Sequence, residues 1–213
     1  DVKEFTMTNY RDEMYPEYVT FKYPKVGMDN AIVSVHCYDI DNQKIMDFSF
    51  KDSVEYYIPR IKWTANPEVF MIYKMNRHQN QLQLHLATAK TGKTTLILEE
   101  TNKYYIDITD DIRFTKDGEK FIWSSEKSGY NHLYLYSIQG HELRALTQGK
   151  FDVTHFYGFD EKRDIIYFQS AEKSPLERHV YSVDLNGKNK KLHTPFSGTN
   201  NTQFSSTFDF YVN

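Results

Sequence analysis

One short pattern recurs along the chain and limits what it can fold into. An aromatic residue, a turn and an apolar run follow one another at Trp63–Tyr73, at Phe114–Trp123 and at Phe159–Phe168. The leading aromatic residues are 51 positions apart between Trp63 and Phe114, and 45 apart between Phe114 and Phe159. A repeat of roughly 40–50 residues with this content is typical of β-propeller blades.

The most regular copy, Tyr105–Gly149, shows what each unit contains. It holds four short β-rich runs, and Gly, Asp, Ser or Asn ends each of them. A four-stranded sheet of this size cannot bury both faces alone, so it must stack on copies of itself. At the observed spacing, 213 residues make about four such units. We therefore predict an all-β fold, a partial β-propeller of about four blades of four antiparallel strands each, incomplete at both ends.

The neighbouring units repeat the same order of runs. We predict the whole chain to be one piece of a single propeller domain, with approximate blades at 1–53 (partial), 54–103, 104–150, 151–198 and 199–213 (partial). The expected strands beside the central unit are Ile58–Thr64, Val69–Met75, Leu82–Ala87, Thr94–Leu98, Thr154–Gly158, Ile165–Gln169, Val180–Val183 and Lys190–His193. No stretch of ten or more residues has helical periodicity.

The first 50 residues depart from this order. Glu4–Thr8 predicts one strand, and the alternating segments Tyr18–Tyr23 and Ala31–Tyr38 predict two more. Pro24–Asn30 would join these two segments into a hairpin that projects from its blade. Ile45–Phe50 then closes the first unit.

Charge and cysteine content exclude several classes of protein. The formal net charge of −3 provides no basic stripe, so nucleic acid is not an expected partner. No apolar run is long enough to span a bilayer. Cys37 is the single cysteine, which excludes an intrachain disulfide and favours a bacterial or reducing-compartment protein. Asn200-Asn201-Thr202 is a glycosylation triplet of a kind that is common by chance.

Local motifs for catalysis or metal binding are missing. None of the nine glycines is two or four positions from another, which excludes a Gly-x-Ser-x-Gly nucleophile elbow and a dinucleotide-binding loop. Thr91–Thr94 resembles the end of a phosphate loop, but Ala87 stands where that motif needs glycine, so we predict a turn. Asp39–Gln43 lacks the calcium-loop glycine and is predicted to be a hairpin turn. We predict no metal site and no cofactor.

Three acidic residues and one thiol are candidate site residues. Asp107, Asp110 and Asp111 cluster at the start of one inner strand. They would either contact a ligand in the propeller channel or serve a turn and strand-start role. Cys37 follows His36, but neighbours in a strand face opposite sides, so a small buried side chain is the better interpretation. Tyr134 and Tyr136 are expected to pack between blades.

Several ordered segments carry a resemblance to a known family. They are Tyr23–Gly27 with Asn30, Tyr57–Trp63, Asp107 through Phe114–Gly118, and Ser125–Leu135. Together these segments resemble dipeptidyl peptidase IV-like enzymes of the prolyl oligopeptidase superfamily of serine peptidases. The resemblance runs over essentially the whole chain, which would then be the middle part of the N-terminal β-propeller domain.

The resemblance implies a function located largely outside this span. Family enzymes join an eight-bladed propeller to a C-terminal α/β-hydrolase domain and release N-terminal dipeptides with proline or alanine second. Their Ser, Asp and His triad would follow Asn213, and their glutamate pair for the substrate ammonium would precede Asp1. No catalytic residue is therefore expected here, and the piece alone should be inactive. The propeller would gate peptides with a free N-terminus and support the hydrolase domain.

Two local roles also follow from the resemblance. Tyr15–Tyr38 resembles the arm through which family members form homodimers, although an ordinary blade hairpin would have the same sequence pattern. Tyr104–Arg113 resembles a loop beside the substrate site, where Tyr105 stands in place of a frequent tryptophan. Tyr105 is thus the one substrate-binding candidate. A non-catalytic propeller module that binds proteins is the competing hypothesis. The bacterial periplasm or cell envelope is the expected location.

Overall fold

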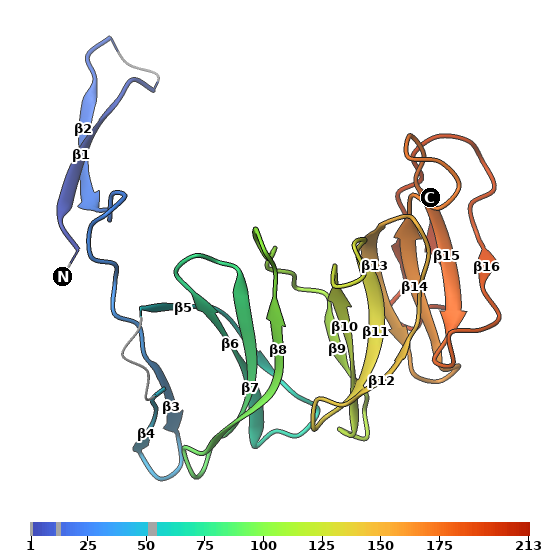
Figure 1. Cartoon of the computed structure of the whole chain (residues 1–213), viewed down its shortest axis with the longest axis horizontal. Coiled ribbons are helices and arrows are strands. Elements are labelled where there is room, and N and C mark those ends of the chain that lie inside the picture. Colours follow the sequence, from blue (N-terminus) through green and yellow to red (C-terminus); the bar gives the residue numbers. More distant parts are fainter. Residues whose placement is uncertain (1, 12–13, 51–54) are drawn as a thin grey trace.

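The computed structural model describes residues 2–11, 14–50 and 55–213. Every regular element among them is a β-strand, and these residues contain no helix that could cross a membrane. The strands form a series of sheets that follow one another in chain order across the molecule (Figure 1).

Three of the sheets have four antiparallel strands each, in simple up-and-down order. Their strands are β5 (Tyr56–Trp63), β6 (Val69–Asn76), β7 (Gln81–Thr88) and β8 (Thr94–Thr101); β9 (Ile112–Phe114), β10 (Lys120–Ser125), β11 (His132–Ser137) and β12 (Glu142–Ala145); and β13 (Val153–Asp160), β14 (Ile165–Ser170), β15 (His179–Asp184) and β16 (Lys191–Leu192). All eight strands expected beside the central unit are found.

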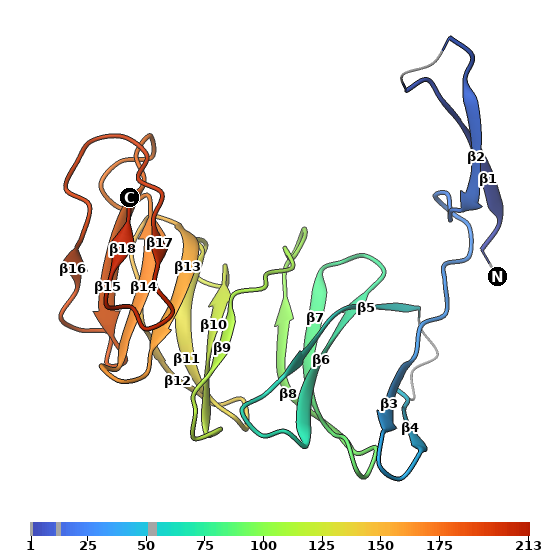
Figure 2. The same ribbon diagram turned by 180° about the vertical axis from the view of Figure 1, so that it is seen from behind.

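The remaining strands form antiparallel pairs. They are β1 (Glu4–Asn9) with β2 (Glu17–Lys22), β3 (Val35–Asp39) with β4 (Lys44–Phe48), and β17 (Gln203–Phe204) with β18 (Tyr211–Val212). The last pair lies beside β14 and β15 when the molecule is seen from behind (Figure 2).

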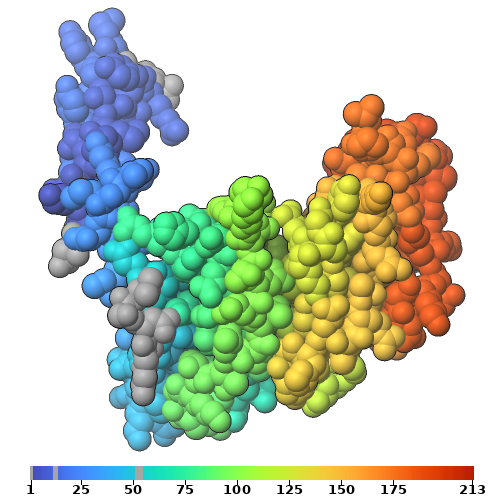
Figure 3. Space-filling view, viewed as in Figure 1, coloured from blue at the N-terminus to red at the C-terminus, as the bar shows by residue number. Residues whose placement is uncertain are grey.

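The predicted hairpin between Tyr18–Tyr23 and Ala31–Tyr38 is wrong. β2 pairs backwards with β1, in the register Phe5↔Phe21, and β3 pairs forwards with β4. Residues 31–34 belong to no strand. A projecting hairpin does exist, but it consists of β1 and β2 and extends beyond the sheets (Figure 3).

The hydrophobic core lies between sheets. One cluster joins Met71 and Tyr73 of β6 to Phe121 and Trp123 of β10. A second cluster fills the next space, between the β9–β12 and β13–β16 sheets, and a third joins β3–β4 to the β5–β8 sheet. Such face-to-face stacking is the defining contact of propeller blades. The predicted partial β-propeller is therefore confirmed.

Strand alternation explains how one sheet serves two cores. In β10, Phe121 and Trp123 face the β5–β8 sheet, and Ile122 between them faces the β13–β16 sheet. All three side chains are at most 1% exposed. Tyr134 and Tyr136 of β11 join the first of these clusters, as predicted for inter-blade packing.

The turn of the repeat has a specific hydrogen-bonding reason. Between β9 and β10, the Thr115 hydroxyl accepts from the backbone N–H of Lys120 at 3.0 Å and donates to the Asp117 carboxylate at 2.6 Å. Asp117 in turn accepts from the N–H of Glu119. Gly118 supplies the positive φ, 73°, that closes the turn.

Candidate functional site

The segment 102–111 crosses from β8, the last strand of one sheet, to β9, the first strand of the next. Its backbone is fixed to the β6–β7 turn, because the N–H groups of Asn102 and Ile106 each donate at 2.9 Å to the carbonyls of Asn80 and Gln79. The side chains of Ile106 and Ile108 pack against the core between the two sheets. The β-rich run Tyr105–Thr109 is therefore not a strand, because its hydrogen bonds go to a turn rather than to a ladder.

Tyr105, the predicted substrate contact, lies at the surface on this segment. Its side chain is 48% exposed, and its hydroxyl donates to the side-chain oxygen of Gln79 at 3.2 Å. The structure thus holds Tyr105 in place while leaving the ring accessible. Whether a peptide touches this ring stays a prediction.

A cavity of about 470 Å³ opens beside Tyr105, between the β5–β8 and β9–β12 sheets. Glu100 of β8, Trp123 of β10 and Tyr136 of β11 line it together with Tyr105. A volume of several hundred Å³ is of the size that small-molecule sites have. Sequence reasoning did not identify this cavity, since its two walls come from different repeats.

The first strands of successive sheets are connected by charged side chains. Asp110, just before β9, accepts from Nε of Arg60 with both carboxylate oxygens at 3.1 Å and from Nζ of Lys62 at 2.7 Å. The Lys62 and Arg60 contacts hold the Asp110 pKa below its usual range. At the following junction, the guanidinium of Arg113 in β9 lies 5.7 Å from the ring centroid of Phe156 in β13.

The other predicted acidic residues differ in their surroundings. Asp111 is partly buried, and burial raises its pKa while the charges of His155 and Arg113 partly oppose that shift. Asp107 is exposed and lines the cavity. The three carboxylates therefore have separate roles, and for Asp110 the strand-start alternative is the one that the structure supports.

The predictions for the two turns are confirmed, whereas Cys37, predicted to be buried, is only partly buried. Cys37 packs against the core between the β3–β4 pair and the β5–β8 sheet. Thr91–Thr94 is the turn before β8, and Asp39–Gln43 is the turn between β3 and β4, where the Asp39 carboxylate accepts from two backbone N–H groups. Among the residues that the structure describes, no group of three or more His, Cys, Asp or Glu side chains could hold a metal ion.

The β3–β4 pair and the residue just before β3 carry a serine, a histidine and an aspartate in series, which sequence reasoning missed. The Ser34 hydroxyl lies 2.7 Å from Nε2 of His36, whose Nδ1 lies 2.6 Å from Asp47. His36 and Asp47 are cross-strand partners, and their side chains are 53% and 74% exposed. Water competes for hydrogen bonds at such exposure, so we assign this series to strand pairing. The two-residue period and the hairpin register were the signals that could have revealed it.

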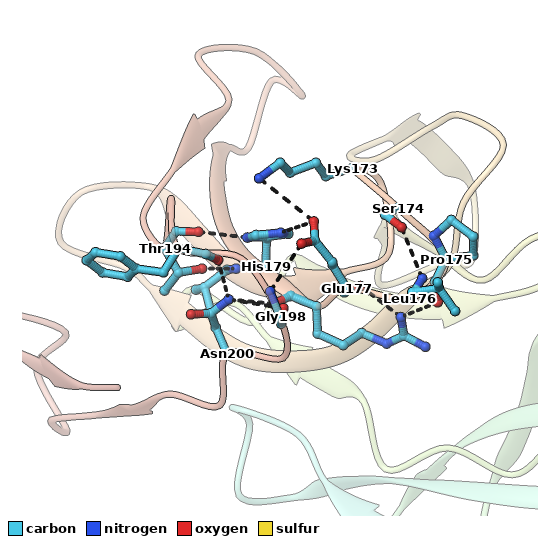
Figure 4. Close-up of polar contacts among 12 residues, drawn as sticks. Lys173, Ser174, Pro175, Leu176, Glu177, His179, Thr194, Gly198 and Asn200 are labelled. Carbon is cyan, nitrogen blue, oxygen red and sulfur yellow. Dashed lines mark hydrogen bonds and ion pairs between the residues drawn. The ribbon is translucent and has the colours of Figure 1, made fainter.

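A second polar cluster surrounds the buried His179 at the start of β15 (Figure 4). Its Nδ1–H donates to the carbonyl of Thr194 at 2.7 Å, and its Nε2 lies 3.1 Å from the Glu177 carboxylate. Glu177 also accepts from the backbone N–H of Gly198 at 3.1 Å. Asn200 is 5% exposed and its amide donates to three backbone carbonyls. The cluster therefore anchors a loop. The side-chain amide of Asn200, the asparagine of the glycosylation triplet, is already engaged in these hydrogen bonds.

Comparisons with known proteins agree on one family. The sequence model described as Dipeptidyl peptidase IV (DPP IV) N-terminal region matches residues 1–213. Among solved structures, the dipeptidyl peptidase 4 of Porphyromonas gingivalis is 37% identical with a TM-score of 0.89, over 99% of this chain and 30% of that one.

Curated relatives show the same similarity. A probable dipeptidyl-aminopeptidase B of Aspergillus niger is 29% identical over 201 residues, which is 87% of this chain and 22% of the relative. A protein named inactive dipeptidyl peptidase 10 of the mouse is 26% identical over 200 residues, which is 87% of this chain and 25% of the relative. The chain thus spans about a quarter of the length of these curated relatives.

Proposed function

The chain belongs to the family of the dipeptidyl peptidase IV N-terminal region, and on that premise we propose that it is the substrate-gating and scaffolding part of the propeller of a serine exopeptidase. The parent enzyme would release N-terminal dipeptides, with Xaa-Pro or Xaa-Ala preferred. The single observation that carries this proposal is the similarity to the P. gingivalis dipeptidyl peptidase 4 over 99% of the chain.

The architecture supports a scaffolding role. Three stacked sheets share continuous cores, and the segment 102–111 is fixed at both its backbone and its apolar side chains. Tyr105 is thereby presented from a rigid support, which is what a residue bordering a substrate requires. The serine, the hydrolase domain that carries it, and an envelope or periplasmic location in a bacterium are parts of the same proposal.

Homodimerisation of the parent is proposed through the N-terminal arm. The predicted segment Tyr15–Tyr38 contains β2 but not β1, so we place the contact on the β1–β2 hairpin and the residues that follow it. Large apolar side chains are exposed there: Met14 at 91%, Tyr15 at 80%, Tyr18 at 73% and Val26 fully. A two-stranded hairpin with such a surface gains stability from a covering partner.

The test uses the parent enzyme with two matched substrates. Gly-Pro-p-nitroanilide should be cleaved, whereas its N-acetylated form should not, because an exopeptidase of this kind needs the free ammonium. Tyr105→Ala should raise KM for the first substrate, and Tyr104→Ala, a neighbour that is 77% exposed, should not. Cleavage of the acetylated form would show that the enzyme is not an N-terminal exopeptidase.

The competing function is a propeller module that binds proteins without catalysis. The similarity to a mouse relative named inactive favours it, although that identity is 26% against 37% for the P. gingivalis enzyme. A parent that cleaves neither substrate, yet retains a stable fold, would favour this module over the peptidase.

A further inference from the structure

The cavity beside Tyr105 contains a carboxylate whose hydrogen-bond donors are both neutral. Glu100 of β8 is partly buried and accepts from Nε1 of Trp123 at 2.8 Å. The Ser125 hydroxyl is its second donor. No ion pair among the described residues includes Glu100. A carboxylate removed from water and bound only to neutral donors is stabilised less than one that faces a cation.

The nearest cation is held elsewhere in the cavity. Nζ of Lys127 donates to the Tyr136 hydroxyl at 2.6 Å and lies 3.9 Å from the ring centroid of Tyr134. Lys127 also forms an ion pair with Glu142 of β12. These three contacts hold the ammonium away from a direct ion pair with Glu100, although the Lys127 charge still acts on that carboxylate. Glu100 therefore lines the cavity without a salt-bridge partner among the described residues.

The walls of the cavity are suited to a cation. Aromatic rings of Tyr105, Trp123 and Tyr136 border it, and aromatic faces attract ammonium and guanidinium groups. The two sheets lie close together at Gly140, which lines the cavity, because a Cβ on this residue would lie 1.7 Å from the carbonyl oxygen of Ile97. The volume of about 470 Å³ accommodates a long side chain.

We propose that this cavity binds the guanidinium or ammonium group of an arginine or lysine side chain in a peptide, with Glu100 as the counter-ion. This site is separate from the expected ammonium site for the peptide N-terminus, and its occupation does not require cleavage. Free polyamines share the alkylammonium chemistry, so the test includes one.

Acidification should weaken this binding. Burial raises the pKa of Glu100 above its usual value. The hydrogen bonds from Ser125 and Trp123 and the charge of Lys127 only partly oppose that shift, and the charge of Glu126 adds to it. Because the ionised form is the one that attracts a cation, affinity should fall as the pH approaches the carboxyl range from above. A neutral ligand in the same cavity would show no such dependence.

The experiment is isothermal titration calorimetry on the full-length protein with Nα-acetyl-L-arginine N-methylamide. Its blocked amine keeps it out of a site that requires a free N-terminus, so failure here is distinguishable from failure of the peptidase proposal. The citrulline analogue, which is similar in shape but neutral, should bind about tenfold more weakly or less. Spermidine is the third ligand. Tighter binding of spermidine than of the arginine ligand would overturn the assignment to peptides.

Three variants complete the test. Glu100→Gln keeps an acceptor for Trp123 and should lower affinity for the arginine ligand about tenfold. Glu119→Gln, an exposed turn residue outside the cavity, should leave it unchanged. If Glu100→Gln fails to fold, the affinity of Tyr105→Ala for the arginine ligand tests the proposal in its place, since this exposed ring can be removed without unfolding the core. Tyr105→Ala should bind the arginine ligand more weakly than the wild type. Equal binding of arginine and citrulline, or unchanged affinity in a folded Glu100→Gln or Tyr105→Ala protein, would overturn the proposal.

Discussion

Replacing Tyr73 with phenylalanine should make this protein more stable. The Tyr73 side chain is fully buried in the core between two sheets, and its ring packs edge-on against Trp123 with centroids 5.6 Å apart. Its hydroxyl has no hydrogen-bond partner among the described residues. Tyr73→Phe keeps the ring and its contacts and removes an oxygen that gave up its water on folding.

The expected gain follows from the desolvation of that hydroxyl. A buried polar group without a partner destabilises a protein by about 1–3 kcal/mol in mutational data. The small volume change of the substitution offsets part of this, so we expect a gain of about 1 kcal/mol. In a protein of this size that corresponds to a rise in Tm of about 2–4 °C.

The gain should increase in alkaline solution. Burial, followed by the charge of Asp110, raises the pKa of Tyr73 in the folded state above its ordinary value of 10.0. Unfolding therefore releases a proton above pH 10, and wild-type stability falls as the pH rises beyond that point. Phenylalanine does not titrate, so the difference between the two proteins should widen there.

Equilibrium urea denaturation, followed by tryptophan fluorescence and by circular dichroism, measures this effect. Tyr136→Phe is the matched control, since Tyr136 is also buried but its hydroxyl accepts from Lys127 at 2.6 Å. That variant should lose about 1 kcal/mol. A Tyr73→Phe protein that loses as much stability as the control would refute the reasoning.

Two further substitutions examine the loop anchor and the close contact between sheets. His179→Ala should destabilise the protein by about 3 kcal/mol by removing a buried hydrogen-bonded ring. The variant should also lose less stability in acid than the wild type, because the His179 contact lowers the pKa of Glu177 and that stabilisation disappears as the pH falls below about 4.5. Thermal melts from pH 7 to pH 3 measure both the destabilisation and its pH dependence. An equal loss of stability in acid for the wild type and the variant would contradict the role of Glu177. Gly140→Ala should lower the free energy of unfolding by more than about 3 kcal/mol, since its Cβ would collide with the Ile97 carbonyl. Gly118→Ala has a similar positive φ but open space around the new Cβ, so it should lower that free energy by about 1 kcal/mol. Equal losses of stability in urea denaturation would show that the sheets can move apart.

Local patterns were sufficient to predict the blades. Side chains alternate along every strand, so a strand with apolar residues on both faces, such as β10, must be covered on both sides. The intervals from Trp63 to Phe114 and from Phe114 to Phe159 then give the spacing at which such strands recur. Both signals depend on residues that are close in sequence, and the structure follows them.

The pairing of the N-terminal strands could not be predicted in the same way. Tyr18–Tyr23 had an alternating neighbour on each side, and either could have supplied the hydrogen bonds. The structure pairs β2 with β1 and leaves residues 31–34 outside any strand. Strand choice of this kind depends on how the ends of the pair join the rest of the fold.

The amino-acid sequence alone therefore determined the class of fold, the repeat and the absence of local catalytic motifs. Tertiary structure alone decided where Tyr105 points, that Asp110 meets Arg60 across 50 residues, and that Glu100 and Trp123 share a cavity. The physical reason is the same in each case. Strand periodicity is encoded within a few residues, but these contacts exist only after two separately formed sheets pack together, and their distances depend on how closely those sheets approach.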